Sequence, residues 1–275
     1  MTGMAERAEA AAGAESTAVA GHADVAASVL GYNDRVARAL RERLHGAGVV
    51  MVNLVSSPGS GKTRLLEELL RRMGPAYGAA ALVGDLATDN DAQRLARSGA
   101  PVRQVSTEGL CHLEATMIQD HHIGWAVGEC RFRFVENVGN LVCPASFDLG
   151  EAARIVFQST TEGEDKPLKY PPMYSSADLA VITKIDLAEA VEFDRAACRA
   201  AIRAVNPGVP IVETSAKTGD GVDDLVHHLV HLRDHALGLA HEHHDHDHDH
   251  DGAADAADQS TDAGGTDQPD TREVA

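Results

Sequence analysis

Short apolar runs alternate with amphipathic segments along most of the 275-residue chain. A short apolar run bounded by turn residues is typical of a buried strand, whereas apolar residues spaced by three and four indicate a helix that packs on a core. The sequence predicts strands over residues 50–55, 79–83, 102–105, 132–135, 155–158, 179–182 and 211–213, and helices over 64–70, 91–97, 113–121, 193–205 and 222–237. This alternation predicts an α/β fold with a doubly wound, mostly parallel sheet and helices on both faces.

The two ends of the chain lack this pattern. Residues 1–30 are rich in Ala, Gly and small polar residues, and we expect a loosely ordered leader there. Asn33 is a candidate N-cap for a first amphipathic helix. The predicted folded domain covers residues 31–238. The His/Asp-rich residues 239–275 cannot build a core, and we expect a disordered tail.

A glycine-punctuated loop joins the first predicted strand to a helix. Glycine lets the backbone turn so that successive N–H groups face a polyphosphate, and the helix N-terminus adds partial positive charge. Lys62 can reach the β- and γ-phosphates, and the Thr63 hydroxyl can ligate Mg²⁺. The first glycine of the G-x-x-x-x-G-K-[ST] pattern is Ser56 here, so the loop must accept a side chain. The predicted phosphate-binding residues are Gly59, Ser60, Gly61, Lys62 and Thr63.

Acidic residues lie at the ends of two predicted strands, on the nucleotide side of the sheet. Asp85 is the candidate magnesium ligand or water-orienting carboxylate, with Asp91 as a weaker candidate that would also suit a helix start. Glu136 ends another predicted strand and can hold Mg²⁺ through water or orient the attacking water. The Gly139 N–H can sense the γ-phosphate. Together with Lys62, Asp85 and Glu136 form the predicted catalytic set.

Base selection is predicted in two later loops. After the strand at 179–182, Asp186 can accept hydrogen bonds from both the ring N–H and the exocyclic amine of guanine, while the Lys184 stem stacks on the base. Thr183 stands where Asn is more usual, at a position that mainly braces the loops, and we expect the replacement to tune the affinity for nucleotide. The segment Ser215, Ala216 and Lys217 can close over the base. GTP is therefore favoured over ATP.

Soft and imidazole ligands form a second candidate site. Cys111, His112 and Cys143 suit Ni²⁺ or Zn²⁺, although buried structural cysteines with an unrelated histidine would explain the same residues. Cys130 and Cys198 fit a core. The tail offers weak imidazole and carboxylate sites suited to nickel storage, at His241, His243, His244, His246, His248 and His250.

Composition narrows the choice of partners. The formal charge is −18, but eleven of the 42 acidic residues and only one basic residue lie from Ala240 onward, so the body is mildly acidic. No basic stripe indicates nucleic acid or an anionic membrane. No apolar stretch approaches a membrane span, and the start lacks a signal pattern. With four scattered cysteines, these features predict a cytoplasmic protein with reduced thiols.

Five sequence blocks closely resemble the hydrogenase nickel-incorporation GTPases, the HypB family. They are residues 55–63, 84–86, 109–112, 136–151 and 161–171, within a resemblance that spans roughly residues 32–235. The resemblance implies a P-loop NTPase fold of the G3E/SIMIBI type. It also implies a slow GTPase that dimerises with nucleotide and, with a small zinc-containing HypA partner, delivers nickel to the large subunit of [NiFe]-hydrogenase.

The same resemblance implies roles for individual residues. Cys111, His112 and Cys143 become nickel or zinc ligands that bridge two protomers, and Lys166 and Lys169 fall near the nucleotide and the dimer contact. Residues 1–30 contain no Cys, so the cysteine-rich N-terminal nickel site of some relatives is absent from them. Some relatives carry an N-terminal histidine stretch, whereas here the histidine run lies near the other end.

Two alternatives remain open at this point. A urease-type nickel-maturation GTPase is disfavoured by the stretch at residues 140–147. A nickel storage or buffering protein with vestigial GTP binding would make the His/Asp tail the main functional element.

Overall fold

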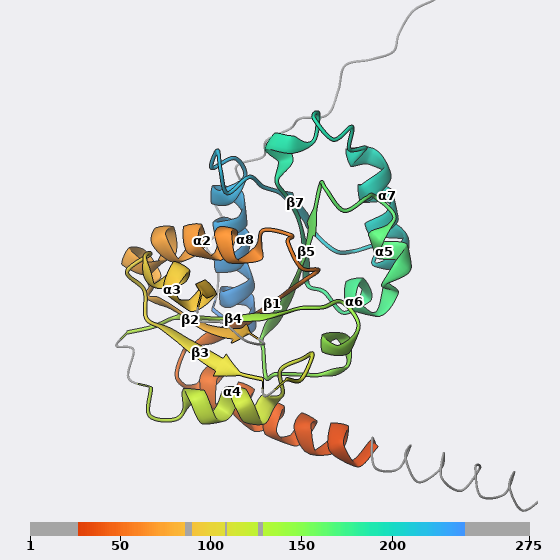
Figure 1. Cartoon of the computed structure of the whole chain (residues 1–275). Coiled ribbons are helices and arrows are strands. Elements are labelled where there is room, and N and C mark those ends of the chain that lie inside the picture. Colours follow the sequence, from red (N-terminus) through yellow and green to blue (C-terminus); the bar gives the residue numbers. More distant parts are fainter. Residues whose placement is uncertain (1–26, 86–89, 108, 126–128, 240–275) are drawn as a thin grey trace, which may run out of the picture. The chain divides into compact units, whose positions relative to one another are not determined.

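A computed structural model describes residues 27–85, 90–107, 109–125 and 129–239 (Figure 1). Its centre is a seven-stranded sheet in the order β3-β2-β4-β1-β5-β6-β7, and every neighbouring pair is parallel. The strands are β1 (Val50–Ser56), β2 (Ala79–Asp85), β3 (Val102–Ser106), β4 (Phe132–Gly139), β5 (Ala153–Ser159), β6 (Leu179–Thr183) and β7 (Ile211–Glu213). The predicted doubly wound α/β fold is confirmed.

The helices cover both faces of the sheet (Figure 1). One face carries α2 (Lys62–Tyr77), α3 (Asn90–Ala96) and α8 (Val222–Ala236), whose apolar residues join β1, β2 and β4 in the largest core cluster. The other face carries a helix over residues 27–46, α4 (Ala115–His122), α6 (Pro171–Ser175) and α7 (Arg195–Val205), which pack in two further clusters. Because both faces are covered, the central strands β1, β5 and β6 are buried at every position, whereas the edge strands β3 and β7 are mostly half-buried.

The first helix differs from its predicted form. The structure describes it from residue 27 to 46, so residues 27–30 are helical and the predicted leader is too long. Asn33 lies inside the helix and does not cap it. Its buried amide donates to the Asp148 carbonyl over 2.8 Å and accepts from the Ala115 N–H over 2.9 Å. The side chain therefore joins three segments of the fold.

Several short elements were not predicted. They are the 3-10 turns η1 (Cys143–Ser146) and η2 (Ile185–Leu187), and the helices α5 (Lys166–Lys169) and α6. Strand β4 also extends past its predicted end, so Glu136 lies within the strand and not at its terminus. Residues 1–26 and the tail from Ala240, including all six predicted storage histidines, lie outside the described residues.

Candidate functional site

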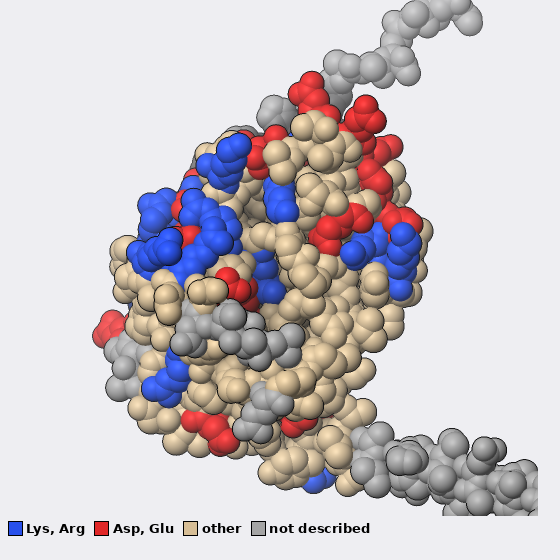
Figure 2. Space-filling model, in the orientation of Figure 1, with Lys and Arg blue, Asp and Glu red and all other residues tan. Residues whose placement is uncertain are grey.

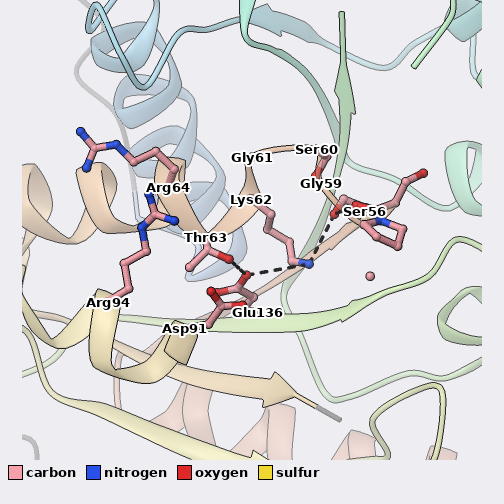
Figure 3. A pocket seen from close by; sticks show the side chains of 13 residues that line it. Ser56, Gly59, Ser60, Gly61, Lys62, Thr63, Arg64, Asp91, Arg94 and Glu136 are labelled. Atoms are coloured by element: carbon pink, nitrogen blue, oxygen red, sulfur yellow. Dashed lines mark hydrogen bonds and ion pairs between the residues drawn. The ribbon is translucent and has the colours of Figure 1, made fainter. Parts of the chain in front are cut away.

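The loop between β1 and α2 surrounds a cavity of about 530 Å³ (Figure 3). Gly59 (φ 74°) and Gly61 (φ 92°) adopt left-handed conformations that favour glycine. The loop backbone, the Lys62 and Thr63 side chains and Glu136 line the cavity. All five predicted phosphate-binding residues therefore lie together at the start of α2.

Ser56 fits the loop despite replacing a glycine. It is fully buried, and its hydroxyl donates to the Ser57 carbonyl over 2.8 Å. The same oxygen accepts from Lys62 Nζ over 3.3 Å, so the side chain helps to hold the lysine in place. Lys62 is 7% exposed, and its Nζ lies 3.9 Å from Glu136 Oε1. A buried cation beside a cavity lined by the glycine-rich loop at the start of a helix suits a phosphate anion.

Strand β4 passes directly beneath this loop. Thr63 Oγ1 donates to Glu136 Oε1 over 2.5 Å, which connects the candidate magnesium-binding hydroxyl to the candidate catalytic acid (Figure 3). At the end of the strand, a Cβ on Gly139 would lie 3.0 Å from Pro58 Cα. A larger residue at this position would therefore press on Pro58, which would have to shift by a few tenths of an ångström.

The two other predicted acids, Asp85 and Asp91, also lie near the phosphate cavity. Asp85 is the last residue of β2, which pairs with β4 through Val83 and Glu136, so its backbone reaches the same edge of the sheet. The structure does not describe the Asp85 side chain. Asp91, in the first turn of α3, lines the phosphate cavity.

Two arginines at the cavity were not singled out from the sequence. Arg64 and Arg94 line it, and both lie beside Glu67, with Arg64 Nη1 at 2.7 Å and Arg94 Nε at 3.4 Å from Glu67 Oε2. Figure 2 shows Lys and Arg side chains gathered at the upper left, over α2 and α3. Neither arginine belongs to a spacing motif, and only the docking of α3 on α2 brings them together.

A second hollow of about 270 Å³ adjoins the first and shares Gly61 and Arg64 with it. The predicted base-recognition residues Lys184, Asp186, Ala216 and Lys217 line this hollow. Asp186 Oδ1 accepts from the Ser215 hydroxyl over 2.7 Å, and Lys217 Nζ lies 3.8 Å from Asp186 Oδ2. The fold therefore brings the two base loops together at the end of the phosphate cavity.

Thr183 and Lys184 connect the base loop to the phosphate loop. The Thr183 hydroxyl donates to the Ser60 carbonyl over 2.6 Å, which is the bracing expected of this residue. Lys184 Nζ donates to the Gly59 carbonyl over 2.7 Å. Lys184 has a left-handed backbone (φ 59°), and its carbonyl accepts from Thr160 Oγ1 over 2.9 Å.

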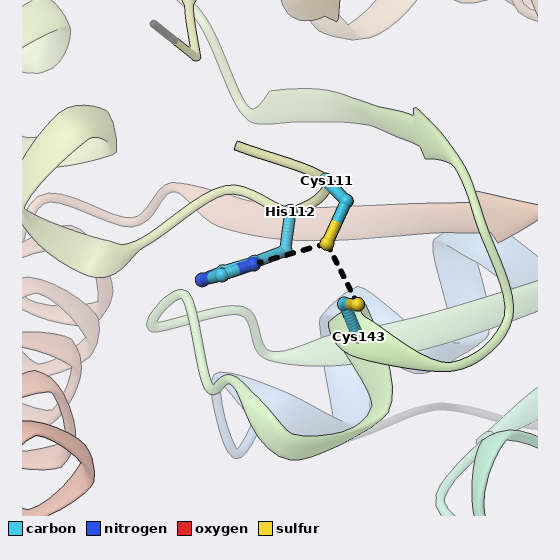
Figure 4. Close-up of side chains that lie close together, drawn as sticks. All are labelled: Cys111, His112 and Cys143. Atoms are coloured by element: carbon cyan, nitrogen blue, oxygen red, sulfur yellow. Dashed lines mark hydrogen bonds between the residues drawn. The ribbon is translucent and has the colours of Figure 1, made fainter. Parts of the chain in front are cut away.

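Cys111, His112 and Cys143 form a third cluster (Figure 4). Their ligand atoms all lie within 4.8 Å of one another. The sulfur atoms of Cys111 and Cys143 are 2.7 Å apart, and His112 Nδ1 lies 3.8 Å from Cys111 Sγ. Among the described residues, no other group of three or more such side chains is this close. A tetrahedral ion with sulfur bonds of about 2.3 Å holds two sulfurs farther apart than they are here, so the two cysteines would separate slightly to bind one ion together with His112.

His112 is held from two sides. Its ring stacks on Phe147, with centroids 3.9 Å apart and an interplanar angle of 24°. Its Nε2 atom faces Glu114 Oε1 at 3.5 Å, which leaves Nδ1 directed at the cysteines. Asn140 donates to the Cys111 carbonyl over 3.2 Å, so the segment after β4 also fixes the first cysteine.

The four cysteines separate into two kinds. Cys111 is exposed, and its contact with Cys143 raises the pKa of its thiol in the absence of metal. Cys130 and Cys198 are buried, as predicted, and burial raises the pKa of Cys198 to about 12. A thiol with that pKa stays protonated and is a poor metal ligand.

One buried and one partly exposed ion pair anchor the loop that follows Cys143. Arg154 Nη2 pairs with Glu151 Oε1 over 2.8 Å, and Asn53 Nδ2 donates to the same oxygen over 3.0 Å. Arg41 of the first helix pairs with Asp148 over 2.5 Å. Asp148 and Glu151, the acids at the end of the 136–151 block, therefore stabilise the fold. Neither belongs to the metal cluster or lines the phosphate cavity.

Lys166 and Lys169 make local ion pairs in α5. Lys166 Nζ lies 3.2 Å from Glu162 Oε1, and Lys169 Nζ lies 2.7 Å from Asp165 Oδ2. Neither lysine is among the residues that line the two nucleotide hollows.

The phosphate cavity, the adjoining base hollow and the parallel sheet define a P-loop nucleotide-binding protein. A family profile described as "CobW/HypB/UreG, nucleotide-binding domain" matches residues 50–213. The chain is 46% identical over 206 residues to the hydrogenase maturation factor HypB of Escherichia coli K12, covering 75% of this chain and 71% of the relative. The chain belongs to the HypB family.

Two further comparisons agree. The HypB of Azotobacter vinelandii is 45% identical over 201 residues, which cover 71% of this chain and 65% of that protein, just under two thirds of its length. A crystal structure of HypB from Helicobacter pylori in complex with nickel superposes with a TM-score of 0.70 at 36% identity, covering 77% of this chain and 99% of that one.

In the described parts of the chain, no helix is both long and apolar enough to span a bilayer.

Proposed function

We propose that this chain is a GTP-hydrolysing nickel metallochaperone that inserts nickel into the [NiFe]-hydrogenase large subunit in the cytoplasm. The nucleotide hollows, the thiolate and imidazole cluster and the nickel complex of the Helicobacter pylori relative support it. We also propose that the histidine tail stores nickel, that a HypA-type zinc protein is a partner, and that zinc can occupy the same cluster.

The observation that carries the proposal is the course of β4. Within a few residues this strand contacts Thr63 through Glu136 and Pro58 through Gly139, and Asn140 then donates to the Cys111 carbonyl. Cys143 follows in η1. The candidate nucleotide and metal sites therefore share one continuous backbone segment, through which a change at the phosphates can reach the metal ligands.

Each of these residues has a proposed role in the hydrolysis of GTP to GDP and phosphate. Lys62 and the loop N–H groups would bind the phosphates and stabilise charge that develops on them. Asp186 would select guanine, and Glu136 would orient water. The Thr63 hydroxyl fits a magnesium ligand at the cavity wall, with Asp85 as the proposed second ligand. Bound Mg²⁺ would neutralise phosphate charge.

Exposed apolar residues flank the metal ligands and favour a GTP-dependent homodimer. Leu110 is 40% exposed and Val142 is 62% exposed, and each directly precedes one of the two cysteines. Exposed apolar groups around an incomplete ligand set favour an interface that buries them and completes the coordination.

The test is a nickel titration of the full chain with either GDP or a non-hydrolysable GTP analogue, monitored through thiolate-to-nickel charge transfer. This absorption reports on the cysteine site and not on the histidine tail. The proposal predicts different affinities in the two nucleotide states. Equal affinities, or no thiolate band at all, would contradict the proposed coupling.

A further inference from the structure

Helix α8 presents an unusual face to solvent. Its buried residues Val222, Leu225 and Leu229 join the largest core cluster. The exposed residues of the helix are all aspartate or histidine: Asp223, Asp224, His227, His231 and His235. An exposed helix face ordinarily mixes polar and charged residues of many kinds, whereas all five of these can bind a metal ion. Helix α8 also lies beyond residues 50–213, the part matched by the family profile.

The spacing places the three exposed histidines in one row. His227, His231 and His235 follow one another at intervals of four residues in a continuous 15-residue helix. Residues four apart on a helix have Cβ atoms about 5–6 Å apart on the same face. Two histidines at this spacing on one helix are the arrangement that binds zinc in the H-E-x-x-H motif.

Two of these histidines act on His228, a half-buried residue of the same helix. The pKa of His228 is lowered mainly by burial and further by His227 and His231, while Asp224 opposes the shift. Asp224, His227 and His228 also line a hollow of about 360 Å³ beside edge strand β7, together with Arg199 and Glu213, whereas His231 and His235 are not among its lining residues. Asp223 instead pairs with Arg72 of α2.

We propose that α8 carries a second divalent-metal site, in which His231 chelates Ni²⁺ or Zn²⁺ together with His227 or His235. His231 is common to both possible pairs, and water completes the coordination. Imidazole suits these borderline cations, and the site has no thiolate. Two neutral ligands hold an ion less tightly than the ligand set of the Cys111 cluster, so ions at α8 exchange faster.

The experiment is residue-resolved footprinting of the full chain with diethyl pyrocarbonate, which modifies accessible imidazoles, with and without Ni²⁺ alone. Mass spectrometry of peptides separates α8 from the histidine tail. We expect Ni²⁺ to slow modification of His227, His231 and His235 several-fold. The variant His231→Gln should lose the protection of both His227 and His235, because it removes the shared ligand.

Two control variants make the outcome decisive. His228→Gln removes a half-buried histidine of the same helix and should leave the protection intact. Cys111→Ser should also leave it intact, so a failure of the proposed nickel chaperone function would not affect this result. Absence of nickel protection at all three histidines, or protection of His227 that persists in His231→Gln, would overturn the α8 site. The substituted side chains are exposed or half-buried, and circular dichroism checks that the variants fold.

Discussion

Replacing Glu114 by Gln tests whether the carboxylate positions the histidine of the metal cluster. Glu114 Oε1 faces His112 Nε2, while His112 Nδ1 faces the Cys111 sulfur. A carboxylate on one ring nitrogen favours the proton there and makes the other nitrogen the better metal ligand. The glutamine has nearly the same size but no charge, so the change isolates this effect.

The structure sets the expected magnitude. Loss of an outer-shell partner ordinarily costs about 10–100-fold in metal affinity. The 3.5 Å contact is longer than an ordinary hydrogen bond, and the Glu114 side chain is 28% exposed. The Phe147 ring would still hold the imidazole plane. We therefore expect a loss at the lower end of this range. Nickel should bind about tenfold more weakly, which corresponds to about 1.4 kcal/mol.

The measurement is a competition titration against a chelator, followed through the thiolate-to-nickel absorption. Nitrogen-15 NMR of the metal-free protein adds a direct readout, because the Nε2–H tautomer of His112 should dominate in the wild type and decline in Glu114→Gln. Glu129→Gln, at an exposed glutamate outside the cluster, is the matched control. An affinity change below about twofold with an unchanged tautomer would refute the positioning role.

Three further predictions concern the nucleotide site and the fold. Asp186→Asn should weaken GTP binding roughly 100-fold, because it loses two charge-assisted hydrogen bonds, and should favour xanthosine triphosphate in a competition assay, because xanthine carries a carbonyl in place of the amine. Gly139→Ala should weaken binding of the GTP analogue in calorimetry, since the new Cβ would press on the Pro58 backbone at 3.0 Å; unchanged affinity would contradict this. Burial, Arg133 and Arg43 lower the pKa of His122 from 6.5 to about 4. Between these two pH values His122 is protonated in the unfolded chain but neutral in the folded one. The folded protein therefore loses stability as the pH falls from about 6.5 towards about 4. Urea unfolding at about pH 7 and about pH 5 should show a smaller loss for His122→Gln than for the wild type.

The sequence predicted the strands well because both faces of the sheet are covered. Strands β1 and β6 are buried at every position, so their sequences are nearly continuous apolar runs. The phosphate and base loops could be found because they directly follow these recognisable strands. Parallel strands end at one edge of the sheet, so loops that follow them lie close together.

Features that depend on packing were not accessible in this way. Pro167, Pro171 and Pro172 resemble loop residues, although each occupies the first turn of a short helix, where proline is tolerated. Asn33 resembled an N-cap because its preference for helix starts is local, whereas its contacts lie more than eighty residues away. Glu114 carried no signal, because its role depends on the orientation of the His112 ring.

The arrangement of β4 bears on how the two proposed sites would communicate. The strand lies at the centre of the sheet between β1 and β2, so it cannot slide without breaking hydrogen bonds on both sides. Movement is easier after Gly139, where the chain leaves the sheet and Asn140 contacts Cys111. A γ-phosphate that orders this turn would therefore alter the separation of Cys111 and Cys143 without disturbing the core. Because such coupling is reciprocal, nickel at the cysteines must change the affinity for the GTP analogue by the same factor by which the analogue changes the affinity for nickel.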